Sequence, residues 1–237
     1  MSEYEYFAYD NVPSYDFGFY ISDGNISDAP ARDVTSVEVP GRNGELTIDN
    51  GRFKNVTVKY KAYTLDGQDG NLRGMRNFLL SRAPKYCKLQ DTLHPDEYRM
   101  GRFLSAFGPD IVGRQAAEVE LSFSCRPERY LVSGDTEHTY TASGTIMNST
   151  SFEAMPIIKV VGSGSLTVGS GIYTITKHDG TMQIDCDKQN AYEASSGANQ
   201  NSFLTVTKWG GLVPGNNTIT IGSGITSVAI IPKWWIL

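Results

Sequence analysis

Histidine, cysteine and carboxylate side chains are the residues from which this sequence could build a catalytic or metal site. The histidines show neither HxH nor HxxxH spacing, and they are His94, His138 and His178. The cysteines are equally scattered, and they are Cys87, Cys125 and Cys186. A zinc site needs clustered ligands, and no G-x-S-x-G turn presents a nucleophilic serine. We therefore expect no catalytic residue, no metal site and no cofactor.

Two acidic motifs raise the possibility of calcium binding or glycosidase catalysis. The run Asp66-Gly67-Gln68-Asp69-Gly70 resembles a calcium loop, but it lacks the D-x-[DN]-x-[DN]-G pattern and the distal glutamate. Asp185 and Asp187 are two carboxylates on one side of a predicted strand, as a glycosidase would need. A surface turn and a solvated strand face explain these motifs without catalysis, and the sequence predicts that the chain is not an enzyme.

The tryptophans offer a binding alternative. Indole rings on a β-sandwich can stack on sugars, and the candidates are Trp209, Trp234 and Trp235. The competing interpretation is that Trp209 covers a core edge and that the terminal KWWIL segment packs into a sheet. Because the second half of the chain has no arginine to fix sugar hydroxyls, we favour packing and keep Trp209 as the weaker candidate for a sugar contact.

The segment EVPGRNGEL, residues 38–46, combines a proline, two glycines, an arginine and an asparagine between two extended-looking runs. A phosphate-binding loop would need G-x-G-x-x-G or G-x-x-x-x-G-K-[ST] between a strand and a helix. Here another extended segment follows, and Asn-Gly is a strong hairpin dipeptide. We predict a chain reversal with Arg42 exposed at its tip, where it could pair with an acidic group of another chain. The turn comprises Pro40, Gly41, Arg42, Asn43 and Gly44.

The composition changes sharply near residue 132. All 11 arginines lie between Arg32 and Arg129, and the remainder is rich in Ser, Thr, Gly and Asn. The chain of 237 residues is long enough for two domains, so we predict a domain over 1–132 and another over 133–237. The net charge of −5 argues against a nucleic-acid-binding surface. No apolar run approaches the length of a membrane span, and the acidic, aromatic N-terminus is not a signal peptide.

The expected elements are mainly β. Alternation predicts strands over 55–63 and 117–125, with Cys125 facing inward. The apolar spacing of Leu72, Met75, Phe78 and Leu79 predicts a short helix over 71–81, capped by Asp69 or Asn71. The second part predicts an antiparallel sandwich or jelly roll without a helix. Its expected strands are 157–161, 165–168, 172–177, 182–185, 203–207, 217–221 and 227–231.

An ordered series of motifs gives the chain a family resemblance. In order they are Tyr15-Asp-Phe-Gly-Phe, Val39-Pro-Gly-Arg-Asn-Gly-Glu-Leu, Phe78-Leu-Leu-Ser, Tyr86-Cys-Lys-Leu-Gln-Asp, Pro95-Asp-Glu-Tyr-Arg, Phe123-Ser-Cys-Arg-Pro-Glu-Arg-Tyr, Ile146-Met-Asn-Ser-Thr, Ala154-Met-Pro-Ile-Ile-Lys-Val-Val-Gly-Ser-Gly, Ile184-Asp, Leu212-Val-Pro-Gly-Asn-Asn-Thr and Ile231-Pro-Lys-Trp-Trp. With these motifs the chain resembles the distal tail protein (Dit) family of long-tailed phages, over essentially its whole length.

The resemblance implies an N-terminal, ring-forming belt domain and a C-terminal galectin-like β-sandwich. It implies a homohexameric hub at the tip of a siphovirus or prophage tail, assembled in the bacterial cytoplasm. The ring would join the tail tube to the tail-fibre or tail-lysin protein, with receptor-binding proteins as further partners. DNA would only pass through its channel, and no membrane is involved. The alternative is a carbohydrate-binding sandwich of the host-adhesion apparatus.

Overall fold

A computed structural model describes the chain in two units. The described residues are 4–24, 28–65, 69–112, 116–176 and 180–237. The first unit covers residues 1–129 with Leu237, and the second covers 130–236. The boundary falls three residues before the junction predicted at 132/133, inside one continuous strand. The mainly β fold class is confirmed, with α1 as the α-helix among the described residues.

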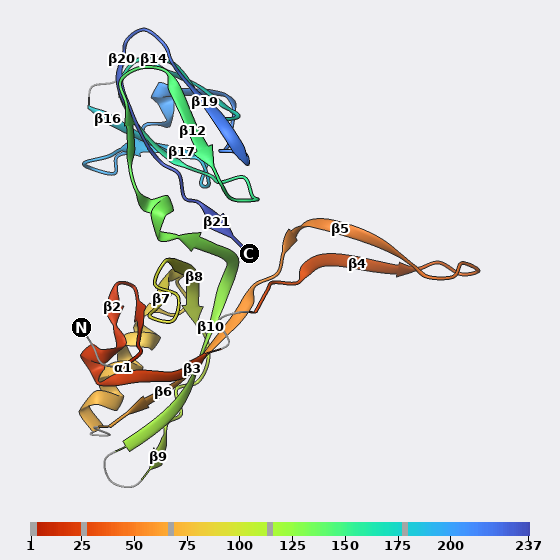
Figure 1. Cartoon of the computed structure of the whole chain (residues 1–237), viewed down its shortest axis with the longest axis vertical. Coiled ribbons are helices and arrows are strands. Elements are labelled where there is room, and N and C mark those ends of the chain that lie inside the picture. Colours follow the sequence, from red (N-terminus) through yellow and green to blue (C-terminus); the bar gives the residue numbers. More distant parts are fainter. Residues whose placement is uncertain (1–3, 25–27, 66–68, 113–115, 177–179) are drawn as a thin grey trace. The chain divides into compact units, whose positions relative to one another are not determined.

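One large antiparallel sheet organises the first unit (Figure 1). Its strand order is β2-β1-β7-β8-β10-β6-β3, and β9 also pairs with β10. The elements of this sheet and its neighbours are β1 (Phe7–Tyr9), β2 (Val12–Pro13), η1 (Ser14–Phe17), β3 (Phe19–Gly24), β6 (Val56–Thr64), α1 (Asp69–Arg82), β7 (Cys87–Asp91), β8 (Glu97–Phe103), β9 (Asp110–Val112) and β10 (Ala116–Leu131). Two further strands, β4 and β5, lie outside the sheet.

The central pair β6 and β10 carries the predicted alternation. Val58 lies opposite Phe123 and Tyr60 opposite Leu121, and all four side chains are buried. Since successive strand residues point to opposite faces, this register places one apolar face of the pair in the core. β10 continues six residues beyond the predicted end at Cys125, because its partners change along its length.

Helix α1 covers this core with one face. Met75, Phe78 and Leu79 are buried, whereas Leu72 is half-buried. The helix begins at Asp69, so both residues predicted as its cap, Asp69 and Asn71, lie inside the helix instead. The outward face of α1 carries Arg73 and Arg76 together with the exposed Leu80.

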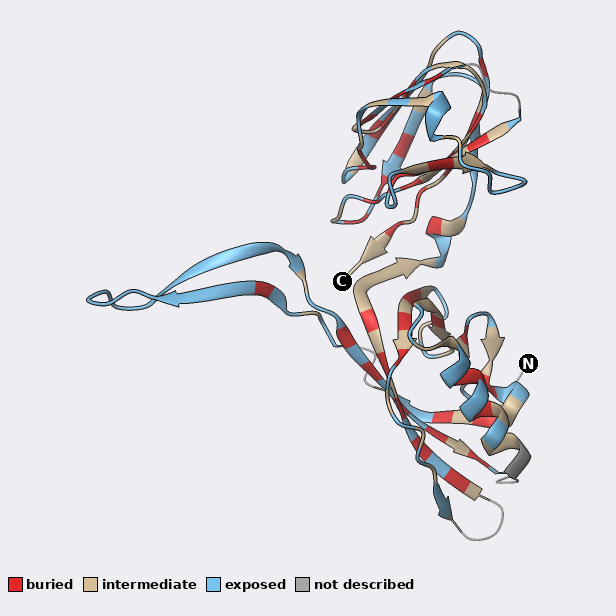
Figure 2. Ribbon diagram, turned by 180° about the vertical axis from the view of Figure 1, so that it is seen from behind, coloured by how far each residue is buried: buried red, intermediate tan, exposed pale blue. Residues whose placement is uncertain are grey.

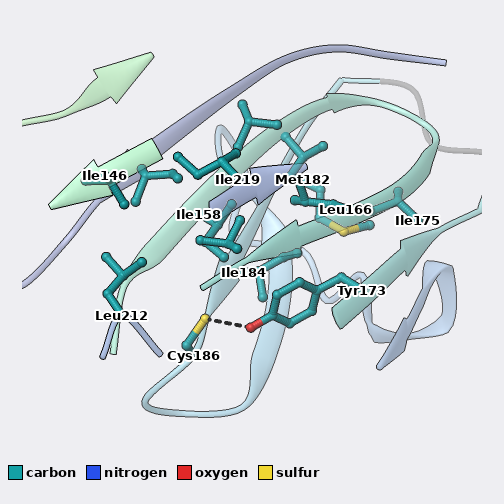
Figure 3. Close-up of a cluster of buried hydrophobic side chains, with 14 of the residues drawn as sticks. Ile146, Ile158, Leu166, Tyr173, Ile175, Met182, Ile184, Cys186, Leu212 and Ile219 are labelled. Atoms are coloured by element: carbon teal, nitrogen blue, oxygen red, sulfur yellow. Dashed lines mark hydrogen bonds between the residues drawn. The ribbon is translucent and has the colours of Figure 1, made fainter. Parts of the chain in front are cut away.

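Two five-stranded sheets form the second unit. Their orders are β11-β20-β13-β16-β17 and β12-β19-β14-β15-β18. The strands are β11 (His138–Tyr140), β12 (Gly144–Asn148), β13 (Ile157–Gly162), β14 (Gly164–Val168), β15 (Gly171–Ile175), β16 (Thr181–Asp185), β17 (Asn190–Glu193), β18 (Leu204–Lys208), β19 (Gly215–Ile221) and β20 (Ile225–Ile231). Side chains from both sheets meet in one buried cluster (Figure 3). The antiparallel sandwich is therefore confirmed, while its galectin-like geometry stays a prediction.

The seven strands predicted in this unit are present, and three others were missed. β11, β12 and β17 are short and lie in polar sequence, so hydrophobic alternation alone does not reveal them. The predicted packing of the terminal KWWIL segment into a sheet is confirmed, since β21 (Trp235–Ile236) pairs with the end of β10, where the Leu131 amide donates to the Trp234 carbonyl oxygen at 2.9 Å. The expectation of no helix is wrong in one respect, because two 3-10 turns occur, η2 (Val132–Asp135) and η3 (Asn201–Phe203).

Candidate functional site

An isolated hairpin, here called the arm, is the most distinctive surface of the first unit. It consists of β4 (Arg32–Glu38) and β5 (Glu45–Phe53), which form a two-stranded sheet of their own. The structure places the PGRNG sequence at its tip, where the Arg42 amide donates to the Val39 carbonyl oxygen at 3.1 Å. Gly41 and Gly44 have φ of 80° and 82°, a region that favours glycine. The arm projects away from the sheet (Figure 1).

The arm is exposed over nearly its whole length (Figure 2). Of its strand residues only Asp33 is buried and only Phe53 is half-buried. A two-stranded hairpin by itself is marginally stable in water, because it buries little apolar surface. An arm of this length is therefore expected to gain most of its stability from a partner.

The register gives the arm two different faces. Val37 lies opposite Leu46, and Thr35 lies opposite Ile48, so these four side chains share one face. Val37, Leu46 and Ile48 are 41%, 43% and 49% exposed. The other face carries Val34 together with polar and acidic side chains, which are Ser36, Glu38, Glu45, Thr47 and Asp49. An amphipathic ribbon of this kind can bind a protein surface through its apolar side.

Opposite charges stabilise the base of the arm. Arg32 donates to both carboxylate oxygens of Asp49, at 2.8 to 3.1 Å, and its guanidinium lies 4.7 Å from the centroid of the Phe53 ring. Arg52 donates to Asp33 at 2.7 Å. These hydrogen bonds favour the ionised carboxylates. The pKa of Asp49 is accordingly lowered by its hydrogen bond from Arg32, and the pKa of Asp33 by its hydrogen bond from Arg52.

The other candidate residues serve packing. Trp209 is half-buried and contacts Tyr173 edge-on, with ring centroids 5.9 Å apart. Trp235 stacks on Phe152 at 4.3 Å, and its indole nitrogen donates to the Glu153 carbonyl oxygen. The sugar contact at Trp209 stays a prediction, because nothing in these contacts tests it.

The two carboxylates near β16 differ in their burial. Asp185 is buried rather than solvated, which corrects the expectation of an open strand face. Its carboxylate accepts hydrogen bonds from the Lys188 amide at 3.0 Å and from the Lys188 Nζ at 2.7 Å. Asp187 is exposed, so the two carboxylates have different surroundings.

Within the described residues, the thiols and histidines do not gather into a site. Cys125 faces the core, and burial raises its pKa to about 12. Cys186 is buried beside the Tyr173 hydroxyl at 3.3 Å, and burial raises its pKa to about 12 as well. His94 lies 3.8 Å from Asp91, whereas His138 is exposed on β11.

Some predictions fall beyond the described part of the chain. His178 and the Asp66–Gln68 portion of the calcium-like run lie outside it. Among the described residues, no group of three or more potential ligands could hold a metal ion. Within the same residues, no helix has the length and hydropathy needed to cross a bilayer.

Comparison with known proteins shows which solved structures have a similar fold. No protein-family model and no curated protein matches the chain. The crystal structure of the Dit (gp 19.1) protein of phage SPP1, a hub of the adsorption apparatus, is similar with a TM-score of 0.71 and 15% identity, over 99% of this chain and all of that one. The phage p2 baseplate in its activated conformation gives a TM-score of 0.60 and 8% identity, over 95% and 97%.

The chain therefore has the fold of a phage distal tail protein. At 15% and 8% identity, these likenesses show how the chain folds and do not transfer a partner or an activity. The residues that matter most in the arm are ones that sequence reasoning missed, namely Val37, Leu46 and Ile48. Their alternation with polar residues was available in the sequence, but alternation does not tell whether an apolar face is covered.

Proposed function

We propose that this chain is the hub subunit of a long, non-contractile phage or prophage tail tip, and that six copies form a ring. The ring links the tail tube to the tail-fibre or tail-lysin protein and to adsorption proteins. Its role is structural rather than enzymatic, and its place is the virion. The exposed arm carries this proposal, because it is an ordered element whose apolar face finds no cover in the described part of its own chain.

The arm can supply one side of a contact that closes a ring. In a ring each copy uses one patch to meet a different patch on the next copy, and the contact repeats until the rotation closes. The arm is one such patch, since it extends from the body and ends in a tip. The apolar residues Val37, Leu46 and Ile48 would supply the buried centre of the contact, and the polar face would supply its register.

The proposed channel lets DNA pass without binding it. Phosphate attraction grows with the number of lysines and arginines that neutralise the backbone. The whole chain has a net charge of −5, so a neutral or acidic channel lining is expected. A basic lining in a ring reconstruction would contradict this part of the proposal.

The test compares the whole chain with a variant that lacks the arm. Residues 33–52 are replaced by a short Gly-Ser turn, which leaves the sheet order of the first unit unchanged. Sedimentation velocity and negative-stain electron microscopy should show a six-membered ring for the whole chain and a folded monomer for the variant. A variant that still closes into rings would show that the arm is not the assembling element. A whole chain that stays monomeric, alone and with a tail tube protein, would remove the proposal.

A further inference from the structure

The charges of the arm are balanced at its base and unbalanced at its tip. At the base, Arg32 pairs with Asp49 at 2.8 Å, and Arg52 and Lys54 pair with Asp33 at 2.7 and 3.6 Å. At the tip, Glu38 lies directly opposite Glu45, and both are exposed. Neither glutamate makes an ion pair or a side-chain hydrogen bond with another described residue.

Two carboxylates in one cross-strand pair repel each other, and this pair weakens the hairpin. A cation placed between them would reverse the effect, and a guanidinium is the best fit because its planar fork binds carboxylates in a bidentate manner. Arg42 is close in sequence, yet it forms no ion pair with Glu38 or Glu45 in the structure. The tip therefore presents two neighbouring, solvent-exposed negative charges to whatever covers it.

Helix α1 presents the complementary charge. Arg73 and Arg76 are exposed and lie three residues apart, so they share one face of the helix. From Asn71 to Arg82 the helix carries no acidic residue. Arg76 makes no ion pair with another described residue. Leu80, one turn further along the same face, is 48% exposed and adds apolar area to the stripe.

The arm cannot reach this helix in its own chain. Figure 1 shows the arm projecting from the sheet in a direction that leads away from α1. A second copy of the chain can supply the helix, because a ring contact joins two different patches of neighbouring copies. The arm tip is one of these patches and the stripe on α1 is the other.

We propose that Glu38 and Glu45 at the arm tip of one copy bind Arg73 and Arg76 on helix α1 of the next copy. This inference rests on the proposed ring and names the polar contact that sets its register. It leaves the apolar face of the arm for the hydrophobic part of the interface. It also explains why the like charges are placed directly opposite each other, since one guanidinium can then bridge both.

Charge reversal on each side tests the contact. Variant A carries Glu38→Lys and Glu45→Lys, and variant B carries Arg73→Glu and Arg76→Glu. Each variant alone should associate at least tenfold more weakly, by sedimentation velocity, because every interface then pairs like charges. Lys208→Glu, an exposed charge change in the second unit, is the control and should associate as the unchanged chain does. Circular dichroism confirms that each variant is folded.

An equimolar mixture of A and B gives the sharpest result. The lysine tip of A fits the glutamate stripe of B, and the unchanged tip of B fits the unchanged stripe of A. A ring that alternates A and B therefore restores every contact, and the mixture should recover most of the association that each variant has lost. The chain that carries all four substitutions should also recover.

The outcomes separate this contact from the ring itself. If the unchanged chain assembles and the mixture of A and B fails to recover, the proposed contact is wrong while the ring stands. The same holds if A and B each assemble normally, which would leave the acidic tip facing solvent or the channel. If the unchanged chain never associates, both the proposed contact and the proposed ring are wrong.

Discussion

The apolar face of the arm allows a quantitative prediction. Replacing Val37, Leu46 and Ile48 together by serine should weaken the association between copies, because the exposed part of each side chain would be buried in the proposed interface. The three side chains are 41%, 43% and 49% exposed. Full burial of such a side chain contributes about 1.5 to 3 kcal/mol. The part still exposed is therefore worth roughly 0.6 to 1.5 kcal/mol for each residue.

The three residues together would contribute about 2 to 4 kcal/mol to each interface, which corresponds to roughly 30-fold to 1000-fold in the association constant. Sedimentation velocity over a range of concentrations measures this change, and thermal unfolding measures the stability of the monomer. The control replaces Ser36 and Thr47, on the opposite face of the same strands, by alanine. Association unchanged by the serine variant would refute the argument.

Three further predictions concern pH, packing and thiol reactivity. The pKa of Asp49 is lowered in the folded arm, so its stabilising contribution is present above the unfolded pKa of about 4 and is lost as pH falls through the folded value. Amide NMR signals of the arm should broaden or shift as the Asp49 carboxylate takes up its proton, and arm signals that stay unchanged while the carboxylate signal of Asp49 titrates would contradict this. Gly134→Ala should destabilise the second unit by about 1 to 3 kcal/mol in thermal unfolding, because the added Cβ would overlap the main-chain nitrogen of Trp234. The control is Gly108→Ala, whose added Cβ meets nothing within 4 Å and should leave the stability unchanged. Cys87 is half-buried and the other two thiols are buried. A thiol reagent at pH 8 should therefore label Cys87 first, and should label all three cysteines only after unfolding. Equal labelling rates for the three cysteines in the native chain would contradict this difference in burial.

Much of the fold could be predicted from the sequence, because a buried face gives a strand or helix a periodic pattern of apolar residues. The strand around Tyr60 and the helix through Met75 appear within one or two residues of their predicted bounds. The seven predicted strands of the second unit appear for the same reason. Short strands such as β17 escaped prediction, because four residues in polar surroundings do not establish a period. Asp185 was misjudged, since its burial depends on Lys188 and on the packing around it.

Only part of the candidate site could be predicted from the sequence. The turn around Asn43 followed from residues that tolerate positive φ, which is a local property of the chain. Nothing local tells that the strands on either side of this turn leave the sheet. Among the described strands, β4 and β5 pair only with each other.

The sequence by itself determined the local elements, the mainly β class, the change in composition near residue 132 and the absence of clustered metal ligands. These depend on side-chain types and on their spacing along one segment. Only the tertiary structure decided that the face containing Val37 and Leu46 is uncovered and that Glu38 lies opposite Glu45. The physical reason is that exposure and cross-strand pairing depend on which distant residues arrive at a surface, and an apolar stripe looks the same in the sequence whether its partner belongs to the same chain or to the next copy.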